Sequence, residues 1–126
     1  MDFRKDIKDL DLYQATGRTC NIVFSPESTG SNFTLLRVEI DPGVKMPMHT
    51  HPDGFELMYY LSGTGEMTVG DEEITVGPDV VVVAKAGVPH QTRVGPNEPL
   101  VCLCTYVPPL PDSYITANYK KIEKTK

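Results

Sequence analysis

The sequence has no long hydrophobic run and little cysteine. None of its apolar stretches reaches the ~18 residues needed to span a bilayer. Residues 1–10 alternate acidic and basic side chains and lack the apolar core of a signal peptide. Three cysteines are too few for a disulfide scaffold and cannot all pair with one another. We therefore expect no membrane partner and a cytoplasmic, reducing location.

Basic charge is also scarce. Twelve lysines and arginines stand against 17 acidic residues, which gives a formal net charge of −5. A protein that binds nucleic acid through its backbone needs a basic surface, so no nucleic-acid partner is expected. The lysines between residues 120 and 126 are interpreted as solvated surface charge.

Glycine and proline, by contrast, are frequent between short apolar stretches. Eleven prolines and ten glycines punctuate 126 residues, a length that fits one domain. Residues 33–40 alternate apolar and polar side chains, as a strand with one buried face does. Gly63-Thr64-Gly65 and Gly70-Asp71 are typical hairpin turns. The pattern predicts nine or ten short strands without βαβ alternation, and hence an all-β sandwich or barrel.

Three local expectations complete the prediction of the fold. The spacing of apolar residues favours a short helix within residues 3–10. The four consecutive valines at 80–83 indicate a strand buried on both faces. The core barrel is expected over residues 19–109, and residues 110–126 are expected to form a tail after the proline-rich segment that ends the sheet.

The three histidines of the chain and one glutamate are candidate metal ligands. His49 and His51 are two residues apart, so on a strand both imidazoles face the same side. Glu56 follows a predicted turn at residues 52–54, and His90 comes from a separate segment. Three nitrogen donors and one carboxylate suit transition metals and match calcium poorly. Spacing alone leaves open that these histidines are unrelated to one another.

The residues around these ligands carry a family resemblance. Gly43 to Gly63 reads Gly-X5-His-X-His-X4-Glu-X6-Gly at every marked position and resembles the first motif of the cupin superfamily. Residues 79–94 resemble the second motif, Gly-X5-Pro-X-Gly-X2-His-X3-Asn, in which Gly87 and His90 are retained. The second motif departs from the family at three positions, which are Asp79, Lys85 and Val94.

The resemblance implies a single-domain jelly-roll β-barrel with a metal site inside. The ligands would be His49, His51, Glu56 and His90, and the cofactor one divalent transition metal. Iron or manganese is expected first, with nickel, zinc, copper or cobalt as alternatives. The resemblance also implies a homodimer, formed through strand exchange near the N-terminus.

The same resemblance implies an enzyme that acts on a small-molecule substrate. We expect a dioxygenase-type oxidoreductase in which the metal acts as a Lewis acid or binds dioxygen, with Glu56 also serving as a base. Two alternatives stay open, because a fold does not decide chemistry. One is a metal-dependent sugar-acid isomerase or lyase, and the other is a non-catalytic, metabolite-binding cupin.

Five further side chains are candidates for the site. Tyr60 shares the face of the predicted glutamate ligand and would donate a hydrogen bond to substrate or pack in the barrel wall. Arg37 and Arg93 could bind an anionic substrate or be surface charges, and alternation points Arg93 away from the metal. Cys102 and Cys104 share one face and are expected to be small buried residues, with a redox or soft-metal pair as the alternative.

Overall fold

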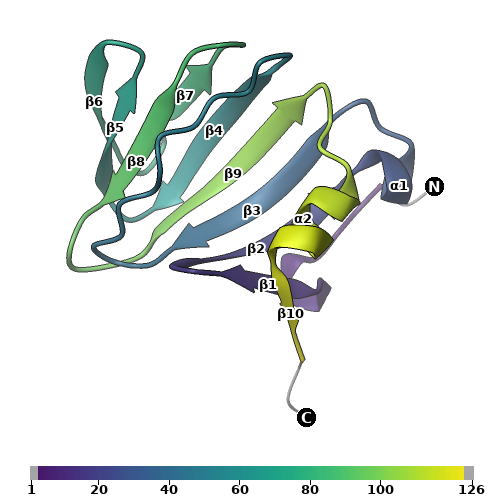
Figure 1. The fold of residues 1–126 in the computed structure, drawn as a ribbon. Coiled ribbons are helices and arrows are strands. Elements are labelled where there is room, and N and C mark those ends of the chain that lie inside the picture. The colour runs from purple at the N-terminus through teal and green to yellow at the C-terminus, as the bar shows by residue number, and fades with distance from the viewer. Residues whose placement is uncertain (1–2, 124–126) are drawn as a thin grey trace.

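The computed structural model describes residues 3–123 and shows a β-sandwich of two antiparallel sheets (Figure 1). The ten strands of this part of the chain are β1 (Leu12–Ala15), β2 (Arg18–Phe24), β3 (Thr34–Ile40), β4 (Phe55–Ser62), β5 (Gly65–Val69), β6 (Glu72–Val76), β7 (Val81–Ala84), β8 (His90–Val94), β9 (Leu100–Val107) and β10 (Lys120–Ile122). The helices are a 3-10 turn at Ile7–Asp9, α1 (Pro26–Thr29) and α2 (Asp112–Asn118).

The two sheets differ in width. The larger sheet has the strand order β10-β1-β2-β3-β9-β4-β7, and the smaller one has the order β6-β5-β8. Residues 43–51 run beside β8, with backbone hydrogen bonds from Met46 to Thr92 (N···O 2.9 Å) and from His90 to His49 (2.8 Å). This arrangement confirms the predicted all-β jelly-roll fold, as an open sandwich rather than a closed barrel.

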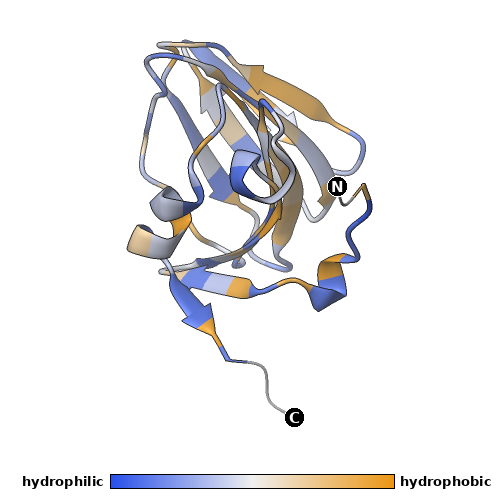
Figure 2. Cartoon of the chain, turned by 90° about the vertical axis from the view of Figure 1, so that its right-hand side faces the viewer, coloured by the Kyte–Doolittle hydropathy of each residue, from blue (hydrophilic) through white to orange (hydrophobic). Residues whose placement is uncertain are grey.

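The inner face of the larger sheet is the core. Leu36, Val38 and Ile40 of β3 are buried, as their alternation predicted, and they lie opposite alternate residues of β9 in the ladder. Each fully buried side chain of this size contributes about 1.5–3 kcal/mol to the free energy of unfolding. Figure 2 shows the apolar colour concentrated in the strands of the sandwich, whereas the strand nearest the C-terminus is largely hydrophilic.

The valine run at residues 80–83 does not form a strand buried on both faces, so that prediction was wrong. In β7, Val82 is 8% exposed, but Val81 and Val83 are 52% and 45% exposed. The reason is that the smaller sheet covers only the inner face of the larger sheet, so the outer face of β7 has no layer packed on it. Neighbouring β4 shows the same split, because Leu57 and Tyr59 on its outer face are about as exposed as these valines.

The segment expected to be a C-terminal tail contains a helix and a strand. Ile115 of α2 is 1% exposed and belongs to the core cluster, so the helix is held by burial of an apolar side chain. After α2, β10 pairs with β1 and extends the larger sheet. Figure 1 shows α2 lying over the part of the larger sheet that the smaller sheet leaves uncovered.

The helices are short throughout the described residues. The helix expected near the N-terminus is a single 3-10 turn. Its N-terminus is capped by the Asp6 side chain, which accepts a hydrogen bond from the Lys8 amide. No helix among residues 3–123 has the length and apolar character needed to span a membrane.

Candidate metal centre

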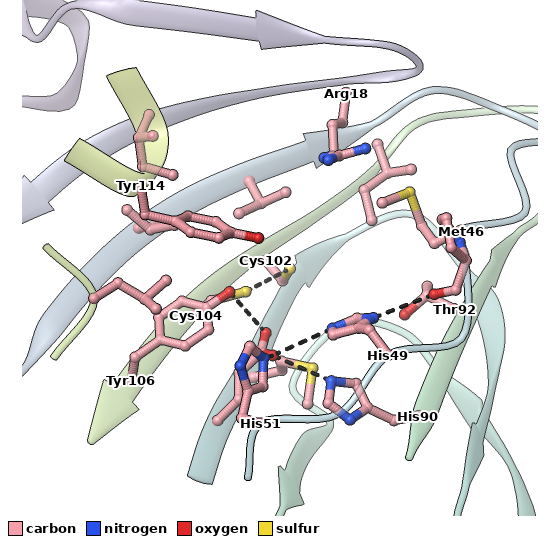
Figure 3. Close-up of a pocket in the computed structure, with 18 of the residues that line it drawn as sticks. Arg18, Met46, His49, His51, His90, Thr92, Cys102, Cys104, Tyr106 and Tyr114 are labelled. Carbon is pink, nitrogen blue, oxygen red and sulfur yellow. Dashed lines mark hydrogen bonds and ion pairs between the residues drawn. The ribbon is translucent and has the colours of Figure 1, made fainter. Parts of the chain in front are cut away.

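The structure brings together the four predicted ligands from three separate segments. His49 and His51 come from the stretch beside β8, Glu56 from β4 and His90 from the start of β8. One ligand atom of each residue lies within 4.8 Å of the others. The Nε2 atoms of His51 and His90 are each 3.2 Å from Glu56 Oε1, and that of His49 is 3.8 Å away (Figure 3).

Backbone hydrogen bonds fix the histidine segments to one another. His49 and His90 form an antiparallel bridge, with N···O distances of 3.0 and 2.8 Å in the two directions. The amide of Gly87 donates to the carbonyl of His51 (2.9 Å). The two cupin-like motifs are therefore joined at the ligands, which holds the three imidazoles in place before any ion binds.

The orientation of two imidazoles is set by backbone carbonyls two residues earlier in the chain. Nδ1 of His49 lies 3.2 Å from the carbonyl oxygen of Pro47, and Nδ1 of His90 lies 3.2 Å from that of Val88. A proton on Nδ1 satisfies each carbonyl and leaves Nε2 directed at the common space, where it donates to Glu56 when protonated and can offer its lone pair to an ion when it is not. This is the outer hydrogen bond that metal-binding histidines commonly make.

Glu56 is a buried carboxylate with its side chain fixed at both oxygens. Glu56 is 5% exposed. Its Oε1 faces the imidazoles, and its Oε2 accepts a hydrogen bond from the Tyr106 hydroxyl (3.2 Å). Burial alone would raise the pKa of Glu56, but the three histidines that face its Oε1 together hold it well below its usual range. The pKa of His49 is raised, because its interaction with the Glu56 carboxylate outweighs burial.

This donor set fits a divalent transition metal. A buried anion needs a positive partner, and three imidazole nitrogens with one carboxylate are ligands that such an ion accepts. The group formed by His49, His51, Glu56 and His90 could thus hold a metal ion. An octahedral ion with these four ligands would keep two positions for other molecules.

The ligands form part of the wall of a cavity of about 260 Å³ between the two layers. Most of the remaining wall is apolar and comes from the inner face of the larger sheet. Tyr114 of α2 lies on the side of the cavity away from the smaller sheet (Figure 3), and Ile115 of the same helix also lines the cavity. The cavity is large enough for a small organic molecule beside the ligand group.

Comparison with known proteins identifies the class. A model of the cupin domain matches residues 36–106, which is more than half of the chain, and the chain belongs to the cupin family. Over 80 residues it is 30% identical to an uncharacterized protein of Methanocaldococcus jannaschii, and the match spans 64% of each protein.

Two solved structures show how far the fold is shared. The chain is similar to ectoine synthase from P. lautus, with a TM-score of 0.81, 16% identity, and coverage of 99% of this chain and 93% of the other. It is also similar to the polyketide cyclase RemF from Streptomyces resistomycificus, with a TM-score of 0.77, 19% identity, and coverage of 100% and 89%. At these identities the likeness shows the cupin fold and leaves the chemistry open.

The other candidates from the sequence lie in different surroundings. Tyr60 is 1% exposed, and its hydroxyl donates to the sulfur of Met67 (2.9 Å), so its catalytic role stays a prediction. Cys102 and Cys104 are buried as predicted, with their sulfurs 3.5 Å apart on the cavity wall. Tyr106 follows them on the same face, so extending that alternation by two residues would have found it.

The two arginines singled out from the sequence do not line the cavity. Arg37 pairs with Glu39 (N···O 3.5 Å), and Arg93 pairs with Glu73 on the smaller sheet. Arg93 thus points away from the metal group, as its alternation predicted. A third arginine, Arg18, lines the cavity instead, and no motif in the sequence pointed to it.

Proposed function

We propose that this cupin is a metal-dependent enzyme of dioxygenase type that acts on a small organic molecule. The observation that carries the proposal is the group of three histidines and a glutamate in the wall of a mostly apolar cavity. Iron or manganese held there would supply Lewis-acid activation or a place for dioxygen beside the substrate.

Two side chains of this protein would orient the candidate ligands and accept a proton from the substrate. The Tyr106 hydroxyl positions Glu56 by donating to Oε2, and burial together with the negative charge of Glu56 raises the pKa of Tyr106 well above its usual range. Tyr106 therefore stays protonated and keeps its role as donor near neutral pH. Glu56 is the candidate base, because a carboxylate freed from the ion can accept a substrate proton at Oε1.

An oxygen-independent isomerase or lyase is the second candidate. The same ligands would serve it, and the two structural neighbours named above are a synthase and a cyclase. A non-catalytic metabolite-binding protein is the third candidate. The homodimer and the cytoplasmic location also stay predictions.

Oxygen consumption separates these candidates. We expect the iron- or manganese-loaded protein to take up about one dioxygen per product formed with at least one member of a panel of flavonols, catechols, thiols and diketones. An oxygen electrode and mass spectrometry of the product would measure this ratio. Turnover that continues under argon would contradict the dioxygenase proposal and favour the isomerase or lyase. Thermal stabilisation without any product would favour the binding protein.

Metal affinity should fall as the pH is lowered. Protons compete with the ion for imidazole nitrogens, and the raised pKa of His49 makes that competition begin above the ordinary histidine value of about 6.5. We expect the apparent affinity to fall by about tenfold per pH unit for each histidine that must lose a proton. Chelator competition at pH 7.5 and 5.5 would measure this, and a pH-independent affinity would contradict the histidine ligands.

The metal-free protein should show a different pH dependence of stability. Because folding raises the pKa of His49, its stabilising effect is present below the ordinary value and is lost as the pH rises through the raised one. Because folding lowers the pKa of Glu56, its effect is present above the ordinary value of about 4.3 and is lost as the pH falls through the lowered one. The contact between His49 and Glu56 thus stabilises the metal-free fold fully between the ordinary pKa values of the two groups, about 4.3 for glutamate and about 6.5 for histidine.

A further inference from the structure

Arg18 brings a positive charge into the cavity on a strand that carries none of the metal ligands. It is the first residue of β2 and lies opposite Ile40 in the antiparallel ladder. Residues opposite each other point to the same face, and Ile40 is buried in the core, so the Arg18 side chain also points inward. Figure 3 shows its guanidinium at the cavity, across the space from the histidines.

Contacts with the C-terminal segment hold the guanidinium in place. Its Nε donates to the hydroxyl of Tyr119 (2.7 Å), and its central carbon lies 5.1 Å from the centre of the Tyr119 ring. Nη1 makes one long hydrogen bond, to the carbonyl of Thr16 (3.4 Å). The fork of the guanidinium is thus oriented while most of its hydrogen-bonding capacity stays unused.

No carboxylate within residues 3–123 forms an ion pair with Arg18. Its guanidinium donates hydrogen bonds to the Tyr119 hydroxyl and the Thr16 carbonyl. Arg37 and Arg93, on the outer faces, each have a glutamate partner. Among the residues described as lining this cavity, Arg18 is the one lysine or arginine, and Glu56 is the one carboxylate.

The charges of the cavity therefore favour an anionic guest. Glu56 is engaged by the three histidines, and a divalent ion bound with it would leave the ligand group with a net positive charge. Arg18 adds a second positive charge in a mostly apolar space, where an uncompensated charge is costly. An anion that enters the cavity would offset both charges.

We propose that Arg18 binds a carboxylate of the substrate, so that the substrate class is a small organic acid whose other end reaches the metal group. The inference rests on the proposed function for its metal-bound end. Guanidinium presents paired N–H donors that match the two oxygens of a carboxylate. Tyr119, at the end of α2, is the positioning residue for this anchor, which links the C-terminal segment to substrate selection.

The test compares two ligands that differ in one anionic group. Succinate carries two carboxylates, whereas succinamate replaces one of them with a neutral amide of similar size. We expect the wild-type protein to bind succinate at least tenfold more tightly than succinamate in isothermal titration. In Arg18→Gln this preference should fall to within about twofold, because the charged partner of the second carboxylate is gone.

Three variants make the result specific. Arg37→Gln removes the same charge from the outer face and should keep the tenfold preference. Arg18→Lys should keep part of it, because the charge remains without the paired donors. Tyr119→Phe should weaken succinate binding less than Arg18→Gln does, since the aromatic ring under the guanidinium is retained. Circular-dichroism melting of each variant shows whether it is folded.

Two outcomes would overturn the proposal: equal binding of the two ligands by the wild-type protein, or an unchanged preference in folded Arg18→Gln. Inorganic phosphate serves as the other anion. If Arg18→Gln loses binding of phosphate but keeps binding of succinate, the assignment to carboxylates is overturned. Metal content of the same samples is measured separately. Absence of metal overturns the proposed function, whereas the titrations on metal-free protein still decide whether Arg18 selects the carboxylate.

Discussion

Glu56→Gln should lower the affinity for a divalent transition metal by at least about 100-fold. Residues that merely orient a metal ligand change affinity by about 10–100-fold when mutated, so loss of the charged ligand itself should reach at least the upper end. The substitution keeps the shape of the side chain and an oxygen that can accept the Tyr106 hydrogen bond. Competition with a chromophoric chelator, together with elemental analysis of protein purified without a histidine tag, measures the change.

The same substitution should remove much of the stabilisation that metal gives. At a metal concentration of about 1,000 times the dissociation constant, binding adds about 4 kcal/mol to the free energy of unfolding, and a 100-fold weaker site loses about 2.7 kcal/mol of it. Glu66→Gln is the matched control, because its side chain is 67% exposed on the smaller sheet. Wild-type metal affinity in folded Glu56→Gln would place the ion outside the proposed group.

Gly63→Ala should reduce the free energy of unfolding by at least about 3 kcal/mol. Gly63 has a φ of +82°, and a Cβ added there would lie 2.1 Å from the carbonyl oxygen of Pro99 and 2.9 Å from the Cα of Leu100. The left-handed backbone costs an alanine about 1–2 kcal/mol, and relieving a clash with backbone on an adjacent segment adds to that. Urea unfolding followed by circular dichroism would measure the loss.

The other glycine that bounds the first motif provides the control. Gly43 has a φ of +75°, but a Cβ there would meet nothing within 4 Å. Gly43→Ala should therefore cost only the backbone part, about 1–2 kcal/mol. Equal losses for the two alanines would show that close approach of the chain at Gly63 is not what requires glycine there.

Local patterns in the sequence were sufficient for the strands and for the ligand set. The alternation in residues 33–40 predicted which side chains of β3 face the core, because a strand places successive side chains on opposite faces. The spacing of His49, His51 and Glu56 within a complete cupin motif predicted the group that the structure brings together with His90. The shared face of Cys102 and Cys104, extended by two residues along β9, would also have predicted Tyr106 at the cavity.

The predictions that failed concern contacts between one element and the rest of the fold. Four consecutive valines are compatible with a strand buried on both faces, but no layer covers the outer face of β7, so two of them are exposed. Residues 112–122 have no strong periodic pattern, yet burial of one side chain, Ile115, and pairing of β10 with β1 order them. Neither the uncovered outer face of β7 nor the partner strand of β10 is encoded within a short window of sequence.

The amino-acid sequence by itself thus determined the all-β class, the inner face of the central strands and the identity of the four candidate ligands. Those properties depend on the two-residue period of a strand and on a motif, both of which are local. Only the tertiary structure decided that α2 lines the cavity, that Tyr106 fixes Glu56 and that Arg18 faces the histidines. These contacts join residues that are far apart in the chain, because the packing of two sheets and a C-terminal helix brings them to one cavity.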